Sequence, residues 1–191
     1  MTANTTDINN NLAPELQVSA WFNTAQPLTL AALRGKVVVL HAFQMLCPGC
    51  VQFGTPQTQR MFDEFDPDRV AVIGLHTVFE NHAVMGRDAL EVFVREYRLR
   101  FPIGIDKHEE GQPKGIPMTM RAYRMQGTPS LLLIDKAGRL RLHKFGHVSD
   151  LMLGLWVGTL LPEEIDLAAV AASAARTPDA GAACNADRCS G

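Results

Sequence analysis

The sequence lacks the features that would indicate a nucleic-acid-binding or membrane protein. Its 18 lysines and arginines nearly balance 20 aspartates and glutamates, and the net charge of −2 gives no electrostatic reason to bind nucleic acid or a charged membrane surface. The longest late apolar stretch, LMLGLWVGTLL at 151–161, is well short of the roughly 20 residues that span a bilayer. We therefore expect neither kind of partner.

A secretory signal is also missing from the N-terminus. The stretch MTANTTDINNNLAPEL has no basic segment followed by an apolar one, which predicts a cytoplasmic protein. The chain has only four cysteines, too few for a disulfide-stapled scaffold in a protein of 191 residues. In a reducing compartment, a close pair of cysteines indicates redox chemistry or metal binding.

Two common catalytic signatures are absent: a glycine-rich phosphate loop and a Ser-His-Asp arrangement. We therefore expect no dissociable cofactor. Composition divides the chain into a flexible N-terminus at 1–13, one working domain at 14–161, and a C-terminal helix and tail at 162–191 that carries a second cysteine pair.

The working domain alternates strand-like and helix-like segments. Apolar β-branched runs predict strands at 36–43, 69–78 and 101–106, and periodic apolar positions predict helices at 56–65 and 88–99. Two extended runs around Gly138 then predict an antiparallel hairpin over 130–146, followed by a helix at 148–160. The pattern indicates an α/β fold in which helices flank a mixed central sheet.

The sequence CPGC, Cys47 to Cys50, comes three residues after the first of these strands. Cys47 falls where the strand ends and a helix begins, among unpaired backbone N–H groups that stabilise a thiolate, so we expect it to be the attacking thiol. Cys50 lies one helical turn further and would resolve a mixed disulfide on Cys47. Pro48 suits a first helical turn, and Pro48 and Gly49 together help to set the redox potential.

Four stretches in this order resemble the thioredoxin fold, and within it the TlpA-like and redoxin (AhpC/TSA-type) proteins. They are PLTLAALRGKVVVLHAF, CPGC, GTPS at 127–130 and LLLIDKAGRLRLHKFG. The resemblance covers about residues 14–160 and implies a thiol-disulfide oxidoreductase, with antioxidant activity among the known roles of redoxins. It also implies a cis proline at Pro129 facing the thiols, and backbone groups of Thr128 that hold an extended substrate.

The chain departs from thioredoxins at two positions. A buried aspartate six residues before the first cysteine is replaced by His41, which could tune Cys47 as a proton acceptor or as a nearby cation, or could be an ordinary core residue. The tryptophan before the first cysteine is replaced by Leu46, preceded by Met45, which predicts a more apolar docking surface.

Peroxidase activity is the nearest alternative. Peroxidatic sites carry Thr or Ser three residues before the reactive cysteine and a proline upstream, whereas this chain has Gln44 and Leu40. These differences disfavour a peroxiredoxin-like thiol peroxidase without removing it, because thiolates do react with peroxides.

The second cysteine pair, Cys184 and Cys189, supports two further hypotheses. The four thiols could form a closed zinc site, although the wide spacing of the tail pair disfavours it. The tail dithiol could instead relay electrons to the CPGC pair. The partners expected from the whole pattern are a protein or small-molecule thiol or disulfide, and an electron donor such as a reductase or glutathione.

Overall fold

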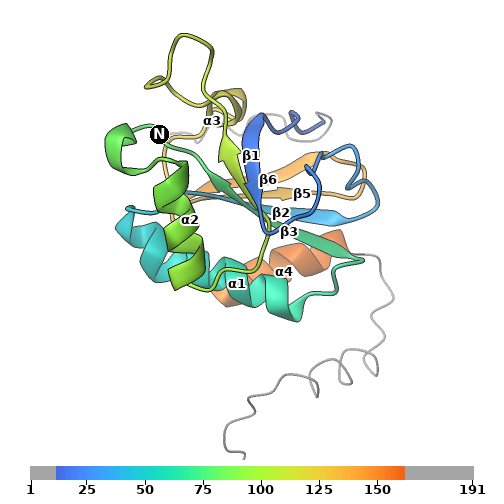
Figure 1. Ribbon diagram of the computed structural model, residues 1–191. Coiled ribbons are helices and arrows are strands. Elements are labelled where there is room, and N and C mark those ends of the chain that lie inside the picture. The colour runs from blue at the N-terminus through green and yellow to red at the C-terminus, as the bar shows by residue number, and fades with distance from the viewer. Residues whose placement is uncertain (1–11, 162–191) are drawn as a thin grey trace, which may run out of the picture. The chain divides into compact units, whose positions relative to one another are not determined.

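Six strands form one mixed sheet in the computed structural model, which describes residues 12–161 (Figure 1). The spatial order is β1-β4-β3-β2-β5-β6. The central strands β2, β3 and β4 run parallel, whereas β1, β5 and β6 are each antiparallel to the neighbour they join. The strands are β1 (Val18–Phe22), β2 (Val37–Phe43), β3 (Val70–His76), β4 (Ile103–Asp106), β5 (Ser130–Ile134) and β6 (Leu140–Phe145).

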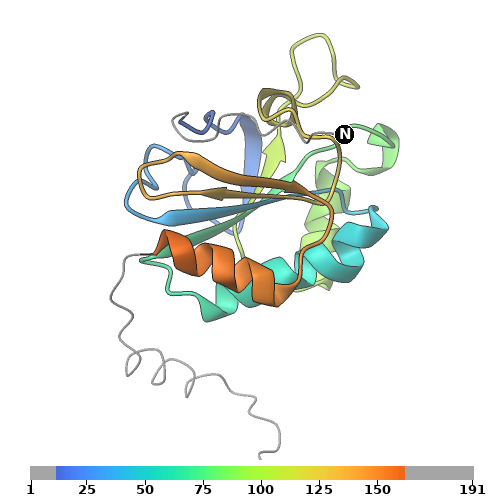
Figure 2. The same cartoon turned by 180° about the vertical axis from the view of Figure 1, so that it is seen from behind.

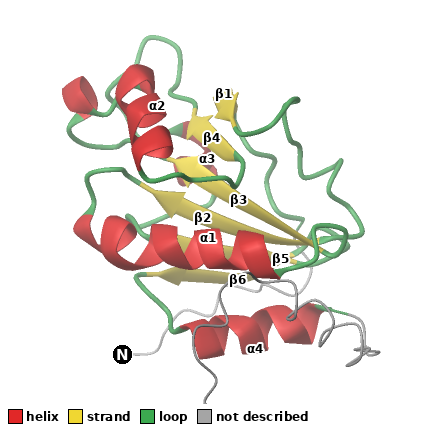
Figure 3. Ribbon diagram, turned by 60° about the horizontal axis from the view of Figure 1, so that its bottom comes forward, coloured by secondary structure: helices red, strands yellow, loops and turns green. Residues whose placement is uncertain are grey.

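Residues 12–161 also contain four α-helices and two short helical turns. Helices α1, α2 and α4 lie on one face of the sheet, and α3 lies on the other (Figures 1 and 3). The helices are α1 (Thr55–Glu64), α2 (Arg87–Glu96), α3 (Met118–Ala122) and α4 (Asp150–Leu160). The short turns are η1 (Cys50–Gly54), which is a π-helix, and η2 (His82–Val84), which is a 3-10 helix.

Strand β2 occupies the centre of the sheet because it can be buried on both faces. All seven of its residues are buried. Val37 and Val39 pack with α1 and α4, whereas Val38 and Leu40 pack on the opposite face with the segment before β2 and with α3. This strand therefore fixes the position of the CPGC turn at its carboxyl end.

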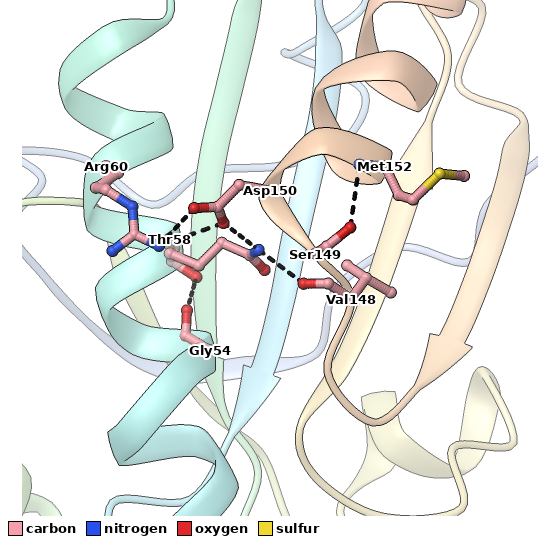
Figure 4. A network of polar contacts seen from close by, with 8 residues as sticks. Gly54, Thr58, Arg60, Val148, Ser149, Asp150 and Met152 are labelled. Carbon is pink, nitrogen blue, oxygen red and sulfur yellow. Dashed lines mark hydrogen bonds and ion pairs between the residues drawn. The ribbon is translucent and has the colours of Figure 1, made fainter.

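Helices α1 and α4 are joined by a polar network at the start of α4 (Figure 4). The buried side chain of Gln57 donates to the carbonyl oxygen of Val148 at 2.9 Å and to Oδ1 of Asp150 at 2.6 Å. Arg60 pairs with Asp150 at 2.9 Å, and Ser149 caps α4 by accepting from the N–H of Met152. The network ties the helix that follows the cysteines to the last helix of the domain.

Loss of the Gln57 amide should destabilise the domain. In Gln57→Leu the carbonyl of Val148 loses its buried donor, which costs about 1–3 kcal/mol of unfolding free energy. Urea denaturation measures the change. Gln52→Leu is the matched control, because Gln52 is exposed and its replacement should change stability by less than about 0.5 kcal/mol. Equal effects of the two substitutions would contradict a stabilising role for the network.

The structure confirms the predicted fold class and places the elements predicted within 36–160 within a few residues of their expected positions. The predicted C-terminal helix and tail at 162–191 lie outside the described residues. Strand β1 was not predicted, since its residues are mostly half-exposed and it pairs only with β4.

Within residues 12–161, no helix combines the length and the apolar character that crossing a membrane requires.

Candidate redox site

The CPGC turn lies at the carboxyl end of β2. Helical turns begin at Pro48, immediately after Cys47, and continue through η1 into α1. The N–H of Val51 donates to the carbonyl oxygen of Cys47 at 3.0 Å, which closes the first turn. Cys47 therefore stands at the start of the helical segment, as the sequence predicts, where backbone N–H groups have no helical acceptor.

The two thiols differ in exposure, and the backbone of Cys50 forms a hydrogen bond with the sulfur of Cys47. Cys47 is half-buried and Cys50 is fully buried, and both are free thiols. The backbone N–H of Cys50 donates to Sγ of Cys47 at 3.3 Å. Burial, reinforced by the adjacent Cys47 thiol, raises the pKa of the Cys50 thiol to about 12. An incoming disulfide thus reaches Cys47 first, while Cys50 is kept protonated behind it.

The loop at 127–129 faces the thiols from the start of β5. The Thr128-Pro129 peptide bond is cis, and Sγ of Cys47 lies 3.5 Å from the carbonyl oxygen of Thr128. A Cβ on Gly49 would meet Cδ of Pro129 at 3.4 Å, so the proline ring packs against the turn between the cysteines. The structure thus brings Thr128 next to Cys47 and Pro129 next to Gly49.

The π-helical turn η1 presses against His41, which lies on β2 beneath it. A Cβ built on Gly54 would lie 2.4 Å from Nε2 of His41, so the imidazole occupies the space that a side chain would need. The ring stacks on Phe43 with centroids 5.6 Å apart. Only glycine fits at position 54, a requirement that the sequence analysis did not identify.

The His41 imidazole is neutral at neutral pH. It is fully buried, and neither ring nitrogen has a hydrogen-bond partner among the described residues. Burial lowers the pKa of His41 to about 3 because the charged ring would lose its hydration. The suggestion that a cationic His41 stabilises the Cys47 thiolate is therefore corrected. The imidazole lies against the helix that carries Cys50 without contributing a charge.

Acid should destabilise the domain through His41 and its neighbour His76, whose pKa burial lowers to about 4. Both rings take up a proton near pH 6.5 in the unfolded chain but stay neutral in the folded one. Their contribution to stability is complete above pH 6.5 and is lost as the pH falls toward 3 to 4. In His41→Leu, the slope of unfolding free energy against pH between about 4 and 6 should fall by about 1.4 kcal/mol per pH unit.

Urea denaturation at a series of pH values measures these slopes. The comparison with the wild type cancels the contributions of the carboxyl groups, which titrate in both chains. An unchanged slope in His41→Leu would mean that His41 is already protonated in the folded protein over this range.

The side chain of Gln44 forms hydrogen bonds with the loop that follows β3. Its Oε1 accepts from the N–H of Phe79 at 3.2 Å, and its Nε2 lies 3.3 Å from Oε1 of Glu80. These bonds anchor the start of the CPGC turn to the segment after β3. Of the apolar pair that the sequence predicts on the docking surface, Leu46 is 56% exposed, whereas Met45 is buried.

Other sequence predictions fall outside this site. Cys184 and Cys189 lie outside the described residues, so the structure does not place the relay or the second half of a zinc site. Within residues 12–161, no group of three or more His, Cys, Asp or Glu side chains is arranged to hold a metal ion. Phe53 is 48% exposed, and its ring lies beside that of His147 with centroids 5.0 Å apart and an angle of 34° between the rings.

Comparison with known proteins identifies a family and two similar solved structures. The sequence profile of the AhpC/TSA family matches residues 10–143. A solved structure described as a thioredoxin-like superfamily protein is 57% identical, with a TM-score of 0.76, over 80% of this chain and 97% of that one. A thiol-disulfide isomerase from Corynebacterium glutamicum is 50% identical, with a TM-score of 0.76, over 82% of this chain and 99% of that one.

A longer relative is similar over part of its length. Protein DipZ from Mycobacterium bovis is 31% identical over 140 residues, which are 70% of this chain but only 18% of DipZ. This chain therefore corresponds to a small part of that protein. The residues matched by the family profile include the CPGC turn.

Proposed function

Because the chain belongs to the AhpC/TSA family, we propose that it is a thiol-disulfide oxidoreductase with Cys47 and Cys50 as its redox pair. The observation that carries the proposal is the asymmetry of the two thiols. One is accessible and accepts a backbone N–H, and the other is buried behind it at the start of the same helix. This arrangement suits an attacking thiol and a resolving thiol.

The exchange reaction has two steps. The Cys47 thiolate attacks a substrate disulfide, forms a mixed disulfide and releases the first substrate sulfur as a thiolate. The Cys50 thiol then loses its proton and attacks Sγ of Cys47, which forms the Cys47–Cys50 disulfide and releases the second substrate thiol. Two electrons pass to the substrate, and the reverse sequence oxidises a dithiol.

The backbone at Thr128 and Pro129 is the proposed substrate-binding edge. Its position beside Cys47 would let an extended chain pair with it, and backbone pairing tolerates many sequences. The substrate class that follows is a protein or small-molecule disulfide, and the proposed electron donor is a reductase or glutathione. We also propose the cytoplasm as the compartment in which this exchange takes place.

Reduction of a disulfide substrate tests the proposed function. The full chain, reduced beforehand, is mixed with a disulfide-bonded peptide and, separately, with hydrogen peroxide, and the loss of protein thiols is followed by stopped flow. We expect fast reduction of the peptide, loss of that reaction in Cys47→Ser, and retention in the control His143→Gln. Fast reaction with peroxide and none with the peptide would instead support the peroxidase alternative.

A further inference from the structure

A cavity of about 350 Å³ opens between the segments that follow β3 and β4. Because β2, β3 and β4 are parallel, these segments lie at the same edge of the sheet as the CPGC turn. Val78 and Met85 line the cavity and belong to the same apolar cluster as Cys50. The cavity is therefore a neighbour of the redox pair, but none of the residues assigned to the exchange reaction lines it.

Two histidines that line this cavity lie next to each other. The ring centroids of His82 and His108 are 5.5 Å apart, with an angle of 59° between the rings. Nε2 of His82 is buried and has no hydrogen-bond partner among the described residues. Nε2 of His108 lies 2.9 Å from the carbonyl oxygen of Val78. Since a carbonyl only accepts hydrogen bonds, this nitrogen carries the proton, and Nδ1 of His108 keeps its lone pair.

The hydrogen bond from His108 to the carbonyl oxygen of Val78 is typical of metal-binding histidines. A ligating imidazole usually donates its other N–H to a backbone carbonyl or a carboxylate, which fixes the tautomer and the orientation of the ring. With metal–nitrogen bonds of about 2.0 Å, two imidazoles that share one ion have ring centres roughly 5 to 6 Å apart. The separation of His82 and His108 fits a shared ion.

The other possible metal ligands in the cavity indicate which metal it would bind. Asp106 lines it, but its carboxylate already accepts from the hydroxyl of Thr77 and from the N–H groups of Thr119 and Met120. Met85, which is 3% exposed, offers a thioether. Imidazole suits zinc, copper, nickel and iron, whereas thioether sulfur favours Cu(I). Copper is the metal common to both donors.

We propose that His82, His108 and Met85 form a binding site for one Cu(I) ion, separate from the Cys47 and Cys50 thiols. The site needs the buried Nε2 of His82, the lone pair of His108 and the thioether of Met85. It does not depend on the exchange reaction, so its test is independent of the proposed function.

The thiols must first be removed, because they would also bind copper. The full chain with all four cysteines changed to serine is titrated anaerobically with Cu(I) against a chromogenic Cu(I) chelator. We expect one equivalent of copper to be retained, with His82→Ala and His108→Ala each lowering the affinity at least tenfold. Met85→Leu keeps nearly the same side-chain volume and should also weaken binding. The control His143→Ala, on β6, should leave it unchanged.

X-ray absorption provides a readout that packing alone would not change. The copper should show nitrogen and sulfur neighbours, and the sulfur should disappear in Met85→Leu. Circular dichroism checks that each variant is folded, and Met85→Leu serves if a histidine variant fails to fold. The proposal is overturned if no stoichiometric Cu(I) is retained, if the three variants bind as the parent does, or if the chain retains Zn(II) but not Cu(I).

Discussion

Cys50→Ser should trap the protein as a stable mixed disulfide on Cys47. Mixed with oxidised glutathione, the variant is expected to accumulate close to one glutathione per chain, whereas the wild type releases it and closes the Cys47–Cys50 disulfide. The buried Cys50 thiol attacks from within the same turn, so its effective concentration far exceeds that of free thiols. With about 1 mM external thiol as the only alternative, release should slow by about 10³-fold or more.

Mass spectrometry of the intact, acid-quenched protein measures the trapped species. The experiment is repeated with Cys184→Ser and Cys189→Ser added, because the tail thiols could also attack the mixed disulfide. Slower release in this second background would support the relay hypothesis. If Cys50→Ser releases glutathione as fast as the wild type in both backgrounds, Cys50 is not the resolving thiol.

Gly54→Ala should distort the helical turn that carries Cys50. The new methyl group would lie 2.4 Å from Nε2 of His41, and the fully buried ring is packed against Phe43. Overpacking of this kind costs about 1–3 kcal/mol of unfolding free energy. Because Cys50 begins the π-helical turn that ends at Gly54, the rate of disulfide exchange should fall along with stability.

Two matched variants show whether the imidazole is the cause. Gly158→Ala, on α4, places a methyl group where nothing lies within 4 Å, and should be neutral or stabilising by up to about 1 kcal/mol. Adding His41→Ala to Gly54→Ala removes the clash, so the double variant should be more stable than the sum of the two single effects predicts. Strict additivity would show that the two positions do not interact.

The redox motifs could be predicted from the sequence because their chemistry is local. A β-branched run followed after three residues by CPGC places a cysteine at a strand-to-helix junction whatever the rest of the fold does. The GTPS motif identified the facing loop only through the resemblance to thioredoxin-like proteins, since nothing local relates residue 128 to residue 47. Their approach depends on the antiparallel pairing of β2 and β5, which is a tertiary feature.

The environment of the pair was harder to predict, and Phe53 shows why. A helix of 3.6 residues per turn would place it on the same face as Met61, in the core. Phe53 instead lies within the π-helical turn and is 48% exposed, whereas Met61 lies in the regular helix that follows and is buried. That turn lies against the His41 ring, and a contact between a strand and a helix leaves no periodic signal in the sequence.

An equilibrium redox titration against a series of glutathione ratios tests the central claim most directly, with thiols counted at each step. Our account predicts one two-electron couple that persists in a chain ending before Cys184 and disappears in Cys47→Ser. If the shortened chain shows no such couple, or Cys47→Ser retains it, then Cys47 and Cys50 are not the redox centre.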